Sequence, residues 1–184
     1  MKNTKDADLD RFLAQVERRA FIIAHIATRD TEEALDLVQD AMLALAHQYR
    51  RRDASEWGPL FHRILQNKIR DWQRRSWIRN RWRAWLPQKK ADGERTNPTT
   101  VEDMADRRAG KPDDHLAAKN TQTALENALH RLPLRQRQAF LLRAWEGLNV
   151  SDTARAMGCS AGSVKTHFSR AVHALRKHLK GHHG

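Results

Sequence analysis

The chain has 184 residues, enough for one ordinary domain or two small ones. Lys and Arg number 34 against 22 Asp and Glu, so the formal net charge is +12. Such a surplus favours an anionic partner, either nucleic acid or an acidic membrane surface. No stretch approaches the ~20 apolar residues of a membrane span, and the opening MKNTKDADLD lacks a signal-peptide core. We therefore expect a cytoplasmic protein with no integral membrane segment.

Helical patterns dominate the N-terminal half. Apolar residues recur at three- and four-residue steps from Leu9 to Ala27, which predicts one helix. Asp30 or Thr31 is expected to cap a second helix, whose first turn carries two glutamates. The segment from Tyr49 to Ser55 is expected to form a loop. A third helix is predicted to start near Trp57, with Pro59 in its opening turn, and to run to Trp85 before Pro87 ends the pattern.

The periodicity is then lost and returns only after about 25 residues. Residues 91–115 hold seven acidic residues and four basic ones, in a protein that is otherwise basic. This composition favours a flexible linker over residues 88–115. Helices are predicted over 116–131, 133–145, 150–157 and 161–179. We therefore expect an all-α protein with two small helical domains, residues 1–87 and 116–184, on either side of the linker.

The last two helices have the spacing of a helix-turn-helix. Asn149 can cap the first, Gly158 can take the positive φ that ends it, and Ser160 can cap the second. In such a motif the second helix lies in the major groove of DNA. The polar side chains opposite its apolar stripe are Ser163, Thr166, Arg170, His173 and Lys177, with Lys165 on the flank. The alternative is an ordinary helical hairpin with a solvated basic face.

The third predicted helix carries a second basic surface. Arg63, Asn67, Arg70 and Arg74 form a polar stripe at steps of four, three and four residues. Between residues 63 and 90 there are ten basic residues and one acidic residue, with four tryptophans interleaved. Basic groups beside aromatic rings suit single-stranded nucleic acid. The alternative is a solvated helix whose tryptophans lie in the core, which we expect for Trp72 above all.

The sequence predicts no catalytic or metal centre. The ten histidines are scattered, and the single Cys159 is expected to be a small core residue. There is no glycine-rich phosphate loop and no Ser/His/Asp arrangement tied to strands. We therefore expect neither a cofactor nor an enzymatic activity.

Two sets of residues resemble a known family, the extracytoplasmic-function (group four) sigma factors of bacterial RNA polymerase. In the C-terminal half they are LPLRQRQAF (132–140), EGL (146–148), the run from Ala154 to Ser160, and GSVKTH (162–167) with Arg170-Ala171. In the N-terminal half they are DLVQDAM (36–42) and FHRILQN (61–67). The resemblance covers nearly the whole chain except the linker and the tail.

The resemblance implies a promoter-specificity subunit that binds core RNA polymerase, recognises the −35 and −10 promoter elements and directs initiation. It assigns polymerase docking to Asp36, Leu37, Gln39 and Asp40. It assigns −35 recognition to Ser163, Lys165, Thr166, His167 and Arg170. Recognition and melting of the −10 element fall to Arg51, Arg52, Arg63, Asn67, Arg70 and Arg74, with the loop 51–55 and Asn67 capturing a flipped base. The chain departs from the family at Leu60, where a tryptophan is usual.

The resemblance also implies a cognate anti-sigma protein, and we expect a monomer when the protein is free. Two other functions are consistent with parts of the sequence. One is a DNA-binding regulator that acts without polymerase, its N-terminal domain serving as a sensor or dimerisation module. The other is a membrane-surface protein anchored by its basic, tryptophan-rich helix, which leaves the second domain unexplained.

Overall fold

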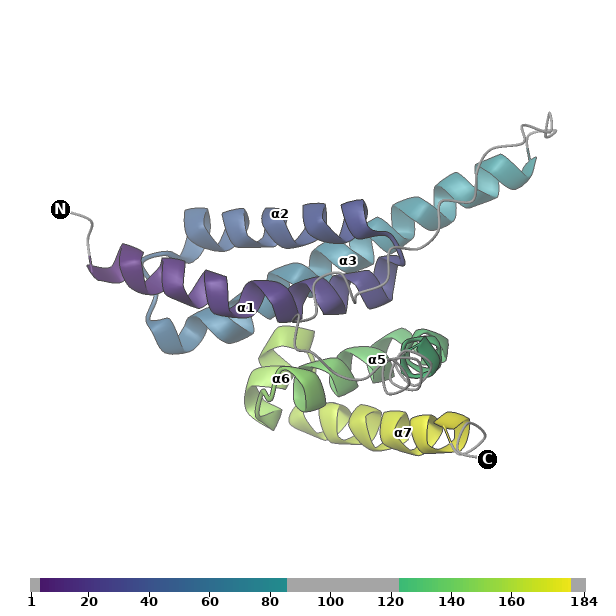
Figure 1. The fold of residues 1–184 in the computed structure, drawn as a ribbon. Coiled ribbons are helices and arrows are strands. Elements are labelled where there is room, and N and C mark those ends of the chain that lie inside the picture. The colour runs from purple at the N-terminus through teal and green to yellow at the C-terminus, as the bar shows by residue number, and fades with distance from the viewer. Residues whose placement is uncertain (1–3, 86–122, 180–184) are drawn as a thin grey trace, which may run out of the picture.

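The computed structural model describes residues 4–85 and 123–179, and every regular element within these ranges is helical (Figure 1). Three long helices, α1 (Thr4–Thr28), α2 (Thr31–Tyr49) and α3 (Ala54–Trp85), pack on one another. We call them the N-terminal bundle. Its centre is filled by fully buried apolar side chains: Ile23, Val38, Leu45, Phe61, Leu65 and Ile69. The end of α3 projects beyond the other two helices (Figure 1).

Local signals set the boundary between α1 and α2. Arg29 takes a left-handed conformation with φ +56°, which ends α1. Asp30 then caps α2, because its carboxylate accepts a hydrogen bond from the Glu33 amide at 3.0 Å. The structure thus selects Asp30 over Thr31 as the cap.

The predicted start of α3 was three residues too late. The helix begins at Ala54, so the preceding loop ends at Asp53 and not at Ser55. Pro59 consequently lies inside the helix and removes the hydrogen bond that Ser55 would accept. Because Ser55 is exposed, water can replace that bond. The early start is held by Trp57, which is buried and donates from its indole Nε1 to the Tyr49 carbonyl at 3.2 Å.

The second group of helices comprises the helical residues 123–131, α5 (Leu134–Phe140), α6 (Val150–Met157) and α7 (Ala161–Leu179), which we call the C-terminal bundle. The bounds of α6 and α7 agree with the prediction. The helix expected over 133–145 does not continue as one α-helix. After Phe140 the backbone widens into a π-type turn over Leu141–Trp145.

The two bundles lie against each other, with α6 beside α3 (Figure 1). One continuous buried cluster contains residues of both, including Ile23 and Ile69 from the first and Leu129, Leu132 and Leu141 from the second. A smaller cluster around Leu142 and Val164 fills the helix-turn-helix itself. The predicted linker 88–115, with the domain boundaries at 87 and 116, lies outside the described residues.

Candidate nucleic-acid interface

The helix-turn-helix is built by three local devices. The Asn149 side chain accepts from the Asp152 amide at 2.8 Å and starts α6. Gly158 closes α6 with φ +63°, and its amide donates to the Ala154 carbonyl. Ser160 caps α7, accepting from the Ser163 amide at 3.1 Å. These bonds confirm the caps and the turn predicted from the sequence.

The predicted face of α7 points away from its core. Val164, Ala171 and Leu175 are buried, while Lys165, Thr166 and Arg170 are exposed. Ser163 and His167 are half-buried. The Ser163 hydroxyl lies 2.9 Å from that of Ser160, so it is already engaged in the cap. Three of the five residues predicted to read the −35 element are therefore fully available on one surface of this helix.

The stripe on α3 is also exposed, and we call it the α3 stripe. Its members are Arg63, Asn67, Arg70 and Arg74. The Arg70 guanidinium donates to Asn67 Oδ1 at 2.7 Å, so this bond uses the amide oxygen of Asn67 and not its nitrogen. Among the described residues Asn67 makes no hydrogen bond to the loop before α3. One turn beyond the stripe, Trp77 is 61% exposed and lies under the Arg81 guanidinium.

The loop before α3 carries the two remaining basic candidates. Arg51 and Arg52 are exposed, and Arg52 lies 3.7 Å from the Glu56 carboxylate. Trp57 does not replace the tryptophan that the family has at position 60, because its ring is buried and packs against Phe12. Leu60 is half-buried. The buried ring of Trp57 thus anchors this loop to the core, and the aliphatic Leu60 occupies the position beside Arg63.

The predicted docking residues on α2 divide into two groups. Asp36, Gln39 and Asp40 are exposed, and Asp40 pairs with Lys68 of α3 at 2.9 Å. Leu37 is the exception, because its side chain is buried in the core. Its assignment as a contact residue is therefore corrected to a core residue. The apolar spacing that predicts this helix also predicts that Leu37 faces the core.

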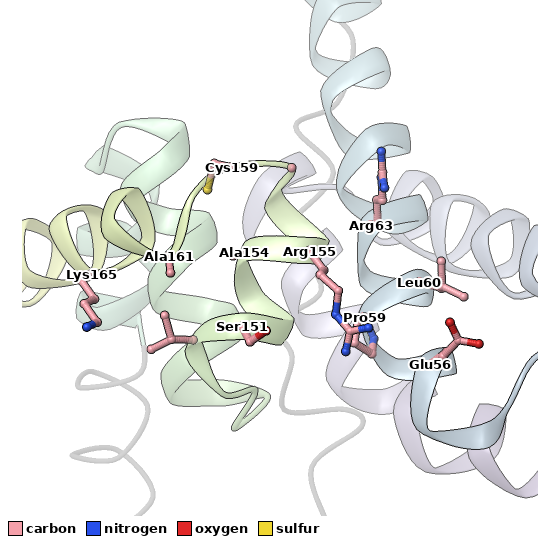
Figure 2. A pocket seen from close by; sticks show the side chains of 12 residues that line it. Glu56, Pro59, Leu60, Arg63, Ser151, Ala154, Arg155, Cys159, Ala161 and Lys165 are labelled. Atoms are coloured by element: carbon pink, nitrogen blue, oxygen red, sulfur yellow. The ribbon is translucent and has the colours of Figure 1, made fainter.

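A cavity of about 950 Å³ joins the two predicted DNA-reading surfaces (Figure 2). Its walls are the start of α3, with Leu60 and Arg63, and the helix-turn-helix, with Arg155, Cys159 and Lys165. Sequence reasoning missed Arg155, since an exposed arginine on a short helix carries no pattern of its own. It also gave no role to Glu146, whose side chain is buried against α1 and α3.

No group of histidine, cysteine and carboxylate side chains in residues 4–85 and 123–179 could hold a metal ion. Within the same residues, no helix is long and apolar enough to cross a membrane.

Two basic side chains, His130 and Arg137, lie where the bundles meet. Burial and the charge of Arg29 lower the pKa of His130, and the same two causes lower the pKa of Arg137.

Comparison with known proteins identifies the family of this chain. Residues 122–175 match the family model for sigma-70 region 4. SigM, an ECF RNA polymerase sigma factor of Mycobacterium tuberculosis, is 32% identical over 176 residues, which cover 92% of this chain and 76% of SigM. The RNA polymerase sigma-E factor of Streptomyces antibioticus is 30% identical over 154 residues, covering 82% of this chain and 73% of that protein.

Two solved structures share the fold. Sigma factor RpoE, from its complex with the anti-sigma factor NepR of Bartonella quintana, superimposes with a TM-score of 0.65 at 22% identity and covers 94% of this chain and 97% of its own. CnrH, from its complex with the cytosolic domain of CnrY, gives a TM-score of 0.59 at 19% identity, covering 94% and 88%. With two exposed basic surfaces on two helical bundles and relatives of this similarity, the chain belongs to the family of ECF RNA polymerase sigma factors.

Proposed function

We propose that the protein binds core RNA polymerase and directs it to promoters by reading two DNA elements with two surfaces of one chain. The observation that carries the proposal is the pair of exposed surfaces on different bundles. One is the face of α7 with Lys165, Thr166 and Arg170, and the other is the α3 stripe. A regulator that acts without polymerase needs only the first surface.

The two surfaces suit different forms of DNA. The N-terminal part of a recognition helix enters the major groove of a duplex, where Arg and Lys pair with guanine. The α3 stripe instead combines arginines with Asn67 and the exposed ring of Trp77, groups that bind phosphates and stack on unpaired bases. We assign −35 recognition to α7 and −10 recognition with strand opening to α3, including Arg51 and Arg52 in the adjacent loop.

The exposed polar face of α2 is the proposed docking site for polymerase. Asp36, Gln39 and Asp40 lie on this face, on a different helix from either basic surface. Leu43, which is 59% exposed, adds an apolar side chain to the same helix. A mixed face of this kind, with an apolar contact inside a polar rim, is typical of protein interfaces.

A charge reversal on α2 tests the docking site. Asp40→Arg removes one surface ion pair, to Lys68, which costs the fold only ~0–1 kcal/mol. Like charge placed in an interface costs several kcal/mol, so we expect a large loss of affinity for core polymerase. The matched control is Glu17→Arg, at an exposed position of α1. Normal assembly of the Asp40 variant would mean that the docking surface lies elsewhere.

The family relation also supports a regulatory partner. The RpoE and CnrH structures are complexes with NepR and with the cytosolic domain of CnrY. We propose that this protein likewise has an anti-sigma partner, that it acts in the cytoplasm and that it is monomeric when free. Its contribution to initiation is binding and positioning, with the chemistry of RNA synthesis left to the polymerase. Co-purification of the tagged protein from its native cells tests the partner.

A further inference from the structure

Glu146 is a buried carboxylate at the junction of the two bundles. Its side chain is 2% exposed although it follows the C-terminal bundle's half-exposed Trp145. Its Oε2 lies 3.5 Å from Arg19 Nε of α1 and 3.3 Å from His62 Nε2 of α3. One carboxylate from the C-terminal bundle therefore contacts two helices of the N-terminal bundle.

The backbone around Glu146 fixes its direction. The π-type turn ends with the Glu146 amide donating to the Leu141 carbonyl and the Leu148 amide donating to the Leu142 carbonyl, each at 3.0 Å. Gly147 takes φ +71°, which reverses the chain immediately afterwards. In an uninterrupted α-helix, the side chain of residue 146 would point in a different direction around the helix axis. The turn thus positions one acidic side chain toward the N-terminal bundle.

The junction has the mixed energetics expected of a contact that can open. Apolar burial and the charge contacts of Glu146 favour closure, as does the hydrogen bond from Arg29 to Asn127 Oδ1 at 2.9 Å. Against it, Glu146 Oε1 and His62 Nδ1 are buried with no hydrogen-bond partner among the described residues. A buried charge with half of its acceptor capacity unused costs free energy. The apolar and charged contacts therefore favour the closed arrangement, while the unpaired buried polar atoms oppose it.

The closed arrangement does not fit a promoter. The centres of a −35 and a −10 element are about 25 base pairs apart, roughly 85 Å along a duplex at about 3.4 Å per base pair. In the structure Arg63 of the α3 stripe and Lys165 of α7 line the same cavity of about 950 Å³ (Figure 2). Residues that share a cavity of this size cannot reach elements so far apart. The bundles must separate before one chain can read both.

We propose that Glu146 is a latch residue, which holds the two bundles in a closed arrangement that competes with promoter reading. Opening withdraws its carboxylate from Arg19 and His62 and frees α6 from α3. The contact is a positioning contact and takes no part in reading DNA. The competition with promoter reading rests on the proposed function, whereas the closure itself does not.

Small-angle X-ray scattering of the free full-length chain tests the closure. Glu146→Lys places a cation against Arg19, and Arg19→Glu places a carboxylate against Glu146. Both variants should give a larger radius of gyration than the wild type, because loss of a charged contact shifts the closed-to-open ratio about tenfold or more. Glu17→Lys, on the exposed face of α1, is the matched control and should stay compact.

Two further measurements separate opening from misfolding. Circular dichroism must show the wild-type helical content, and if Glu146→Lys fails this test, Arg19→Glu alone decides. The double variant Arg19→Glu/Glu146→Lys restores opposite charges and should recover part of the compactness. Folded single variants as compact as the wild type, or a double variant no more compact than the single ones, would overturn the latch.

Titration into core polymerase and a promoter fragment tests the competition. The Arg19→Glu variant should need several-fold less protein for half-maximal promoter complex, since the apparent affinity scales with the open fraction. An expanded variant with no gain would overturn the competition. A wild type that forms no promoter complex with polymerase would instead refute the proposed function and leave the scattering result as it stands.

Discussion

Two alanine substitutions in the helix-turn-helix should change stability in opposite directions. Gly158 has φ +63°, and a Cβ built there meets nothing within 4 Å, so Gly158→Ala carries only the backbone cost of a left-handed residue, about 1–2 kcal/mol. Gly162 lies inside α7, where an added Cβ would lie an ordinary 3.8 Å from Ser160 Oγ. Each substitution also restricts the unfolded chain, which stabilises the fold by about 0.4–1 kcal/mol.

The difference between the two variants isolates the backbone term. The entropy gain is common to both, so the free energies of unfolding should differ by about 1–2 kcal/mol, with Gly162→Ala above and Gly158→Ala below the wild type. Thermal unfolding followed by circular dichroism should show melting temperatures about 2–8 °C apart. Gly158→Asn should lie between Gly158→Ala and the wild type. Equal melting temperatures for the two alanine variants would refute the left-handed turn.

Three further predictions concern DNA reading and pH. Arg170→Ala should weaken binding to a −35 duplex by ~1–3 kcal/mol and relax discrimination at one base pair; equal weakening on all sequences would make Arg170 a phosphate contact. Asn67→Ala holoenzyme should keep −35 binding but open the −10 region poorly, with only partial recovery on a pre-melted template. Templates that differ at single −10 bases check this, and unchanged base preferences would show that Asn67 is a scaffold. Burial, Arg29 and Arg137 lower the pKa of His130, so the folded protein resists its protonation and the free energy of unfolding should fall as pH drops below about 6.5; denaturant titrations of His130→Gln should show a smaller fall than the wild type.

The helices of the C-terminal bundle follow from short-range signals. Asn149, Gly158 and Ser160 each act on residues within four positions of themselves, so their types alone set the ends of α6 and the start of α7. The start of α3 was predicted less well. Proline favours the first turn of a helix, and Pro59 therefore suggested a start near Trp57. The burial of Trp57 against Phe12 of α1, a tertiary contact, extends the helix back to Ala54.

The proposed binding surfaces could be predicted because they are periodic. The α3 stripe and the exposed face of α7 both repeat at helical spacing, and the apolar residues opposite them are buried as expected. Leu37 shows the limit of a motif, since it lies among docking residues in the sequence but belongs to the apolar face of α2.

The junction between the bundles had no such signal. Glu146, His62 and Arg19 are single residues from distant segments, and only the fold brings them together. The acidic composition of residues 91–115 predicted a flexible linker between two domains, whereas the buried cluster is continuous across both bundles. Contacts between rigid groups of helices depend on surface shape, which a helical pattern does not encode.

Promoter selection by this protein is tested most directly by run-off transcription with purified core RNA polymerase on a library of genomic promoter fragments from the protein's own cells. If the protein directs initiation, the transcripts should require it and should start downstream of two shared sequence elements. Arg170→Ala should alter the preference at the upstream element, and Asn67→Ala the preference at the downstream one. Polymerase that initiates no more specifically with the protein than without it would contradict the claim.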